Sequence, residues 1–115
     1  MKGRILNISY EPSLARTRQA LLENAGFTVI TVLSEEEAVA EAKRCEYDLA
    51  IVGHSIPRGD KERIVKEIAV CDSHILSLRR HGDLPVAETD YSMEAIEGPT
   101  ALLNTVREIF RELEE

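Results

Sequence analysis

Three residues that could take part in chemistry follow the most apolar short run of the chain. The run is Leu49–Val52, and Gly53, His54 and Ser55 come directly after it. An imidazole titrates near neutral pH, so His54 could act as a base or accept a phosphoryl group, and Ser55 or Ser9 could be its nucleophile. No Gly-x-Ser-x-Gly turn or orienting acid accompanies them. We therefore predict that His54 is a partly exposed loop residue and that the chain has no catalytic residues.

Two other groups of charged residues have the composition of a binding site. Arg79 and Arg80 follow a second apolar run and could bind an anion, although solvated loop charges are the commoner case. Glu35, Glu36 and Glu37 have the composition of a metal site. Consecutive side chains diverge on a helix, so these acids are better explained by the positive end of the helix dipole. We expect neither a metal nor a cofactor.

Composition limits the class of protein. The chain has 115 residues, of which 43% are hydrophobic and 30% charged, and a formal net charge of -7 with a pI near 5.0. These values predict one globular domain over residues 1–115 and argue against a nucleic-acid partner, whose phosphates require a basic surface. No signal peptide or spanning helix is evident, so no membrane association is expected. Cys45 and Cys71 fall in helical patterns without CxxC spacing, which predicts two reduced core thiols and a cytoplasmic protein.

Strand-like segments alternate with helical patterns along the chain. Strands are predicted at 4–9, 27–32, 49–52, 74–78 and 90–93, and helices at 12–25, 35–45, 60–71 and 100–113. Ser34 and Asp60 are the predicted caps of the second and third helices, and Gly26 is the predicted end of the first. Residues 79–89 have no helical period and are predicted to form a loop. Right-handed crossovers then give an α/β fold: a parallel sheet covered by helices on both faces, with its site at the carboxyl ends of the strands.

The order and spacing of several segments resemble a known family. The segments are 5–8 followed by 11–14, 21–27, 47–52 followed by Ile56-Pro57, and Asp90-Tyr91. Over essentially the whole chain they resemble a response-regulator receiver domain. The resemblance implies a CheY-like (flavodoxin-like) five-stranded parallel sheet of order 2-1-3-4-5, here with the fourth helix shortened or missing.

The resemblance also implies chemistry that this sequence lacks. The family requires an aspartate acceptor at the end of the third strand and carboxylates that hold magnesium against the phosphate. The acceptor position is Gly53 here, the acidic pair is replaced by Ser9 and Tyr10, and the lysine expected after strand five falls near Glu94. The hydroxyl expected just after the fourth strand falls on Arg79, with Ser77 two residues earlier. We refer to these residues, together with His54 beside Gly53, as the vestigial pocket: Ser9, Tyr10, Gly53, His54, Ser77, Arg79 and Glu94.

We therefore expect a degenerate, or pseudo-, receiver domain of a response regulator. It would act in signal transduction by protein–protein interaction without phosphorylation, would not be an enzyme, and would bind a signalling protein or output module, with a homodimer as another form of contact. Three alternatives stay open: a phosphorelay receiver with a substitute acceptor (His54, Ser55 or Asp60), a small-anion sensor using the vacated pocket, and a hydrolase using Ser9 and His54.

Overall fold

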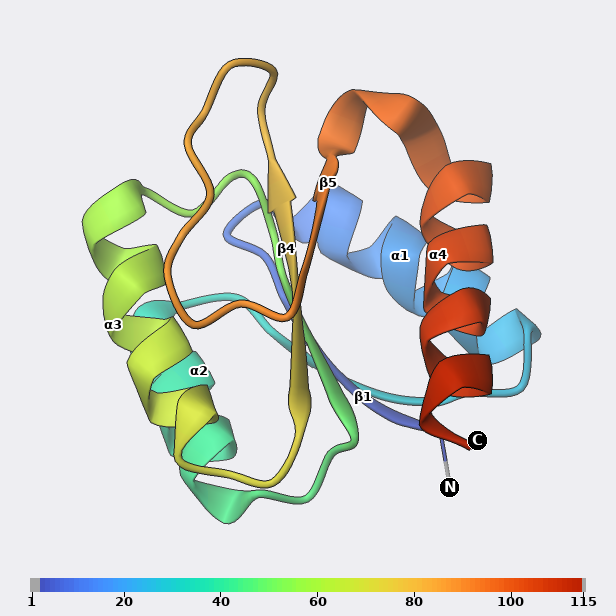
Figure 1. The fold of residues 1–115 in the computed structure, drawn as a ribbon, viewed down its shortest axis with the longest axis horizontal. Coiled ribbons are helices and arrows are strands. Elements are labelled where there is room, and N and C mark those ends of the chain that lie inside the picture. The colour runs from blue at the N-terminus through green and yellow to red at the C-terminus, as the bar shows by residue number, and fades with distance from the viewer. Residues whose placement is uncertain (1–2, 115) are drawn as a thin grey trace.

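The computed structural model describes residues 3–114, apart from the side chain of Ile96, and shows a parallel sheet between two layers of helices (Figure 1). The strands are β1 (Arg4–Ile8), β2 (Thr28–Val32), β3 (Leu49–Val52), β4 (His74–Arg79) and β5 (Tyr91–Glu94). The helices are α1 (Pro12–Asn24), α2 (Glu35–Arg44), α3 (Arg58–Ala69) and α4 (Gly98–Leu113), with a 3-10 turn at Ala95–Glu97 that the sequence analysis did not predict. The strand order, β2-β1-β3-β4-β5, confirms the predicted fold class.

Alternation along the strands produces two cores. Leu6 and Ile8 belong to the cluster that packs against α2 and α3, whereas Ile5 belongs to the cluster that packs against α1 and α4. Successive strand residues point to opposite faces, so a strand covered on both sides must be apolar at every position. All four residues of β3 are buried, as its continuous apolar run predicts.

Local signals set most helix ends where they were predicted. Pro12 begins α1, and Gly26 follows its end with φ 99°. The Ser34 hydroxyl accepts the Glu37 N–H at 3.2 Å and caps α2. The predicted Asp60 cap was wrong: α3 begins at Arg58 after Pro57, which places Asp60 in the first turn. Pro57 therefore holds the cap position, and the Asp60 carboxylate binds Tyr10 and Arg63 instead of capping the helix.

A loop takes the place of a helix between β4 and β5. Residues 80–90, all described by the structure, contain turns but no helical segment. The loop runs on the α3 side of the sheet (Figure 1). It is fastened there by the buried Val86 and by Arg58, whose guanidinium donates to the carbonyls of Leu84 and Pro85 at 2.9 and 3.4 Å. This agrees with the expected loss of the fourth helix.

The two cysteines form a disulfide, so the prediction of reduced thiols was wrong. The Cα atoms of Cys45 and Cys71 are 5.5 Å apart, within the usual range for a disulfide. Cys45 follows α2 in a left-handed conformation, and Cys71 follows α3, so the packing of these two helices brings the thiols together. The sequence separation of 26 residues concealed this pairing. The inference of a cytoplasmic protein from reduced thiols no longer holds.

Within residues 3–114, no helix is long and apolar enough to pass through a membrane.

Candidate functional site

Gly53 lies at the carboxyl end of the central strand, and no side chain fits there. It follows β3 directly, is buried, and donates its N–H to the carbonyl of Ile8 at 2.9 Å. A Cβ at this position would lie 2.8 Å from that carbonyl oxygen and 3.1 Å from Nη1 of Arg18. Real Cβ atoms essentially never approach a backbone oxygen so closely. The site where the resemblance implies a phosphoryl acceptor is therefore closed by backbone and by a cation.

That cation, Arg18, was missed by the sequence analysis. It comes from α1 and is only 8% exposed, and its Nη1 atom is buried without a hydrogen-bond partner among the described residues. Burial lowers the pKa of Arg18, but a guanidinium remains charged in proteins. Its position in the sequence was a usable signal, because it falls four residues from both Leu14 and Leu22 on the apolar stripe of its helix.

His54 is half-buried and is bound by Arg18. The Nη2 atom of Arg18 lies 3.2 Å from Nδ1 of His54. A guanidinium can only donate, so Nδ1 accepts and the proton of the neutral ring is on Nε2. Burial lowers the pKa of His54, and the positive charges of Arg18, Arg80 and Lys61 lower it further. Among the described residues His54 forms no hydrogen bond to a serine, so the base and hydroxyl pair of a hydrolase is not assembled.

Ser9 and Ser55 meet at this edge, where they join two loops. Their hydroxyl oxygens are 3.3 Å apart. The Ser55 hydroxyl also accepts the N–H of Tyr10 at 3.1 Å, and the Ser9 hydroxyl accepts the N–H of Glu11 at 3.2 Å. These contacts hold the loop after β1 against the loop after β3.

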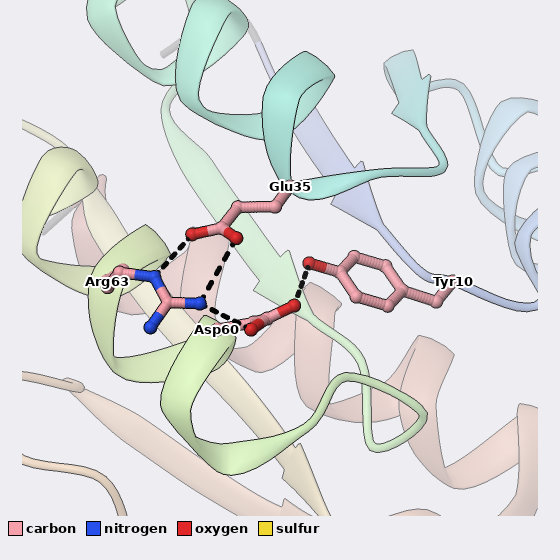
Figure 2. A network of polar contacts seen from close by, with 4 residues as sticks. All are labelled: Tyr10, Glu35, Asp60 and Arg63. Atoms are coloured by element: carbon pink, nitrogen blue, oxygen red, sulfur yellow. Dashed lines mark hydrogen bonds and ion pairs between the residues drawn. The ribbon is translucent and has the colours of Figure 1, made fainter.

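A second network fixes the loop after β1 to α2 and α3 (Figure 2). The Tyr10 hydroxyl donates to Asp60 at 3.0 Å. Arg63 binds the other Asp60 oxygen at 2.5 Å and binds both oxygens of Glu35, at 2.7 and 3.2 Å. Burial, followed by the Asp60 carboxylate, raises the pKa of Tyr10 above its ordinary range. Both oxygens of Asp60 are thus engaged inside the protein.

The remaining residues of the vestigial pocket lie on β4 and β5. Ser77 is 1% exposed within the sheet. Arg79 donates to the hydroxyl of Ser92 at 2.9 Å, and Glu94 lies 3.0 Å from the ring of His81. The polar contacts of Arg79 and Glu94 are thus made with Ser92 of β5 and with His81 of the β4–β5 loop, and not with residues around Gly53.

Lys61 is a second buried cation that the sequence analysis missed. It belongs to α3, is 6% exposed, and donates to the carbonyl of Leu78 at 2.6 Å. Burial lowers its pKa to about 8. The signal was again an apolar position, because Lys61 precedes Ile64 by three residues on the buried face of its helix.

The residues at this edge do not fit the magnesium ion that the fold implies. Ser9 and Tyr10 offer hydroxyls where Mg²⁺ takes carboxylates, Gly53 offers none, and the guanidinium of Arg18 repels a divalent cation. Over residues 3–114, no three or more His, Cys, Asp or Glu side chains are grouped so as to hold a metal.

The architecture is that of solved receiver domains. A CheY-like receiver domain from Methanospirillum hungatei JF-1 superimposes with a TM-score of 0.84 at 18% identity, covering 99% of this chain and 98% of that one. A receiver domain from Clostridium thermocellum gives 0.83 at 21% identity, with 97% of each chain covered. The response regulator TrrA from Thermotoga maritima, in complex with Mg²⁺ and BeF, gives 0.78 at 24% identity, with 94% and 98% covered.

No protein-family model matches the sequence, and no curated protein matches it. The structural similarity, at identities of 18 to 24%, establishes the architecture and leaves the chemistry to the residues of this chain. The chain has the fold of response-regulator receiver domains.

Proposed function

We propose that this chain is a pseudo-receiver: a protein-interaction module of signal transduction that works without aspartyl phosphorylation and is not an enzyme. The observation that carries the proposal is the pairing of Gly53 with Arg18. Where the fold would place the acceptor carboxylate there is no side chain, and a buried guanidinium occupies the adjacent space.

Phosphoryl transfer to an aspartate depends mainly on how charged groups are placed around the phosphate. A carboxylate must approach a phosphate dianion, and a magnesium ion held by carboxylates makes that approach possible. Here the carboxylate is absent and the metal-binding positions carry Ser9 and Tyr10. Arg18 supplies a fixed positive charge, but no carboxylate stands beside it to accept a phosphoryl group.

Each substitute acceptor is engaged by internal hydrogen bonds. Nδ1 of His54 accepts from Arg18, and the protonated Nε2 has no free lone pair for attack. The hydroxyl of Ser55 is held by Ser9 and Tyr10, and both Asp60 oxygens are bound, as described above. These contacts favour a structural role for all three residues and argue against a phosphorelay role.

The loop between β4 and β5 supports an interaction role on an altered surface. The resemblance to receiver domains implies partner contacts around the fourth helix, the fifth strand and the last helix. Here residues 80–90 replace that helix, and Leu84 is 74% exposed on the replacement. The surface formed by residues 80–90 differs in shape from the one that partners of receiver domains bind. We therefore propose a partner specific to this chain: a signalling protein, an output module or a second copy. The net charge of -7 suits a basic partner surface.

The proposal is tested by incubating the protein with acetyl phosphate and Mg²⁺ and measuring its intact mass. We expect no phosphoryl adduct, whereas a receiver domain with its aspartate, treated in parallel, gains one. A stoichiometric adduct on this chain would overturn the proposal, and its loss in His54→Gln, Ser55→Ala or Asp60→Asn would identify the substitute acceptor. A protein partner, once identified, is expected to bind with the same affinity before and after this treatment.

A further inference from the structure

A cationic cavity lies beside the vestigial pocket, between α3 and the loop that follows β4. Its volume is about 230 Å³. Drug-sized ligands usually occupy roughly 300–1,000 Å³, so this cavity suits a small ligand or a single polar group. Ile56, Leu84 and Val86 form apolar parts of its wall. Ile56 and Val86 are buried, whereas Leu84 is largely exposed. Charges beside the buried apolar atoms are partly shielded from water, which strengthens their electrostatic interactions.

Positive charge is concentrated in this cavity although the chain as a whole is acidic. Four cationic side chains line it, opposed by the single carboxylate of Asp83: they are Arg58, Lys61, Arg79 and Arg80. His54 also lines the cavity, with its proton on Nε2 as argued above. Glu62 also lies 3.7 Å from Arg58, but Lys61, Arg79 and Arg80 still outnumber Asp83 in the lining. Like charges repel one another at short range, so this excess of positive charge favours a bound anion.

The cations have donors that the protein does not use. Lys61 has three N–H donors, of which one binds the carbonyl of Leu78. Within the described residues, the side chain of Arg80 forms no hydrogen bond and no ion pair, and Arg79 uses only its Nε, toward Ser92. Lys61 is more than nine-tenths buried, so its ammonium is already held in place and is largely desolvated before a ligand arrives.

We propose that this cavity binds a small phosphate-type anion, with Lys61 at its inner end and Arg79 and Arg80 at its rim. A phosphate offers several oxygens to these donors, and planar guanidiniums bind such oxygens in pairs. Inorganic phosphate and the phosphate group of a small ester share this chemistry. The site is formed by α3 and the β4–β5 loop rather than by Gly53, so binding involves no covalent transfer and does not depend on the proposed function.

Arg80→Gln is the most informative variant, because the side chain takes no part in the described packing or hydrogen bonds and the protein should fold normally. Lys61→Met removes the inner charge and keeps an unbranched apolar side chain only one heavy atom shorter. The matched controls are Lys66→Met, an exposed lysine on the same helix, and Arg107→Gln, an exposed arginine on α4.

Binding is measured by calorimetric titration at pH 7 and constant ionic strength, with inorganic phosphate in one arm and adenosine monophosphate in the other. We expect saturable 1:1 binding in at least one arm, weakened about tenfold or more by Arg80→Gln and by Lys61→Met, as the loss of a charged hydrogen bond implies, and unchanged in both controls. Binding of phosphate alone shows that the cavity takes only the free anion, whereas binding of adenosine monophosphate, with or without binding of phosphate, shows that it admits a phosphate ester.

Three results would overturn the proposal: no saturable heat in either arm, equal weakening in Arg107→Gln, or retention of full affinity in Arg80→Gln. The experiment contains no phosphodonor, so its outcome is independent of the mass measurement that tests the proposed function.

Discussion

Nη2 of Arg18 lies 3.2 Å from Nδ1 of His54, and this contact joins the middle of α1 to the loop after the central strand. Both residues lie at the edge of the sheet where receiver-fold chemistry would occur. The contact fixes the tautomer of the imidazole and places a permanent positive charge beside it. It therefore makes His54 a neutral residue under conditions in which a free histidine would begin to take up a proton.

Arg18→Met is expected to raise the pKa of His54. Burial is the first cause of its low pKa and remains in the variant, but the nearest positive charge is removed. The pKa is measured by a pH titration of the imidazole resonances by NMR, which also report the tautomer. Arg16→Met, an exposed arginine on the same helix, is the control and should leave the titration unchanged. A wild-type ring protonated on Nδ1 at neutral pH would contradict the assignment.

Gly53→Ala is expected to lower the free energy of unfolding by about 1–3 kcal/mol, the usual cost of forcing an extra methyl group into a packed interior. The new Cβ would lie 2.8 Å from the carbonyl oxygen of Ile8, which is backbone and cannot move alone. Gly59→Ala on α3 is the control, because its Cβ would meet only Arg63 at 3.7 Å. That change should stabilise the helix by up to about 1 kcal/mol. Urea denaturation measures both. Equal stability of Gly53→Ala and the wild type would show that the strand end is looser than described.

Lys61 should make the protein more stable as the pH rises from about 8 toward 10. Its pKa is lowered to about 8 in the folded protein, by burial first and by the charges of Arg58 and Arg79, which Asp83 partly offsets. Between that value and the ordinary pKa of 10.5, the unfolded chain binds the proton and the folded protein does not. The free energy of unfolding therefore increases with pH in this window, by on the order of 2 kcal/mol.

Other groups titrate in the same window, so the measurement is the difference between wild type and Lys61→Met in urea denaturation at successive pH values. The variant should lack the gain, while Lys66→Met, an exposed lysine, should keep it. A parallel pH dependence of wild type and Lys61→Met would show that the ammonium is better solvated than its burial indicates.

Reduction of the Cys45–Cys71 disulfide is expected to lower the free energy of unfolding by about 3.5 kcal/mol, as the chain-entropy relation gives for a loop of this length. Denaturation with and without a reductant measures the loss. A double Cys45→Ala, Cys71→Ala variant serves as the control, since its stability should not respond to reductant. Two titratable thiols in the native, unreduced protein would contradict the pairing.

Local patterns were sufficient to predict the fold because each strand and helix carries its own signal. Gly26, Ser34 and the apolar run of β3 gave ends and burial without reference to the rest of the chain. The placement of Gly53 at the carboxyl end of β3 was also predictable, because it follows that run directly. The features that could be predicted are those that depend on neighbouring residues in the sequence.

The residues that were missed depend on neighbours in space. Arg18 and Lys61 occupy apolar positions of their helices, and their long side chains reach groups on other elements, His54 and the carbonyl of Leu78. Asp60 looked like a cap because acids often begin helices, but Tyr10 and Arg63 use both of its oxygens. The pairing of Cys45 with Cys71 required two helix ends to meet. The clearest signal that was not used is a charged residue at an apolar position of a helix, because it would have predicted the burial of Arg18 and Lys61.

The disulfide turns residues 45–71 into a closed covalent ring that contains the central strand. A single protease nick anywhere within the ring would therefore leave both fragments attached to each other until a reductant is added. The same closure offers protein engineering a place for new chain termini: the turn after Gly53 could be opened, for a split reporter or a circular permutant, without the two halves separating.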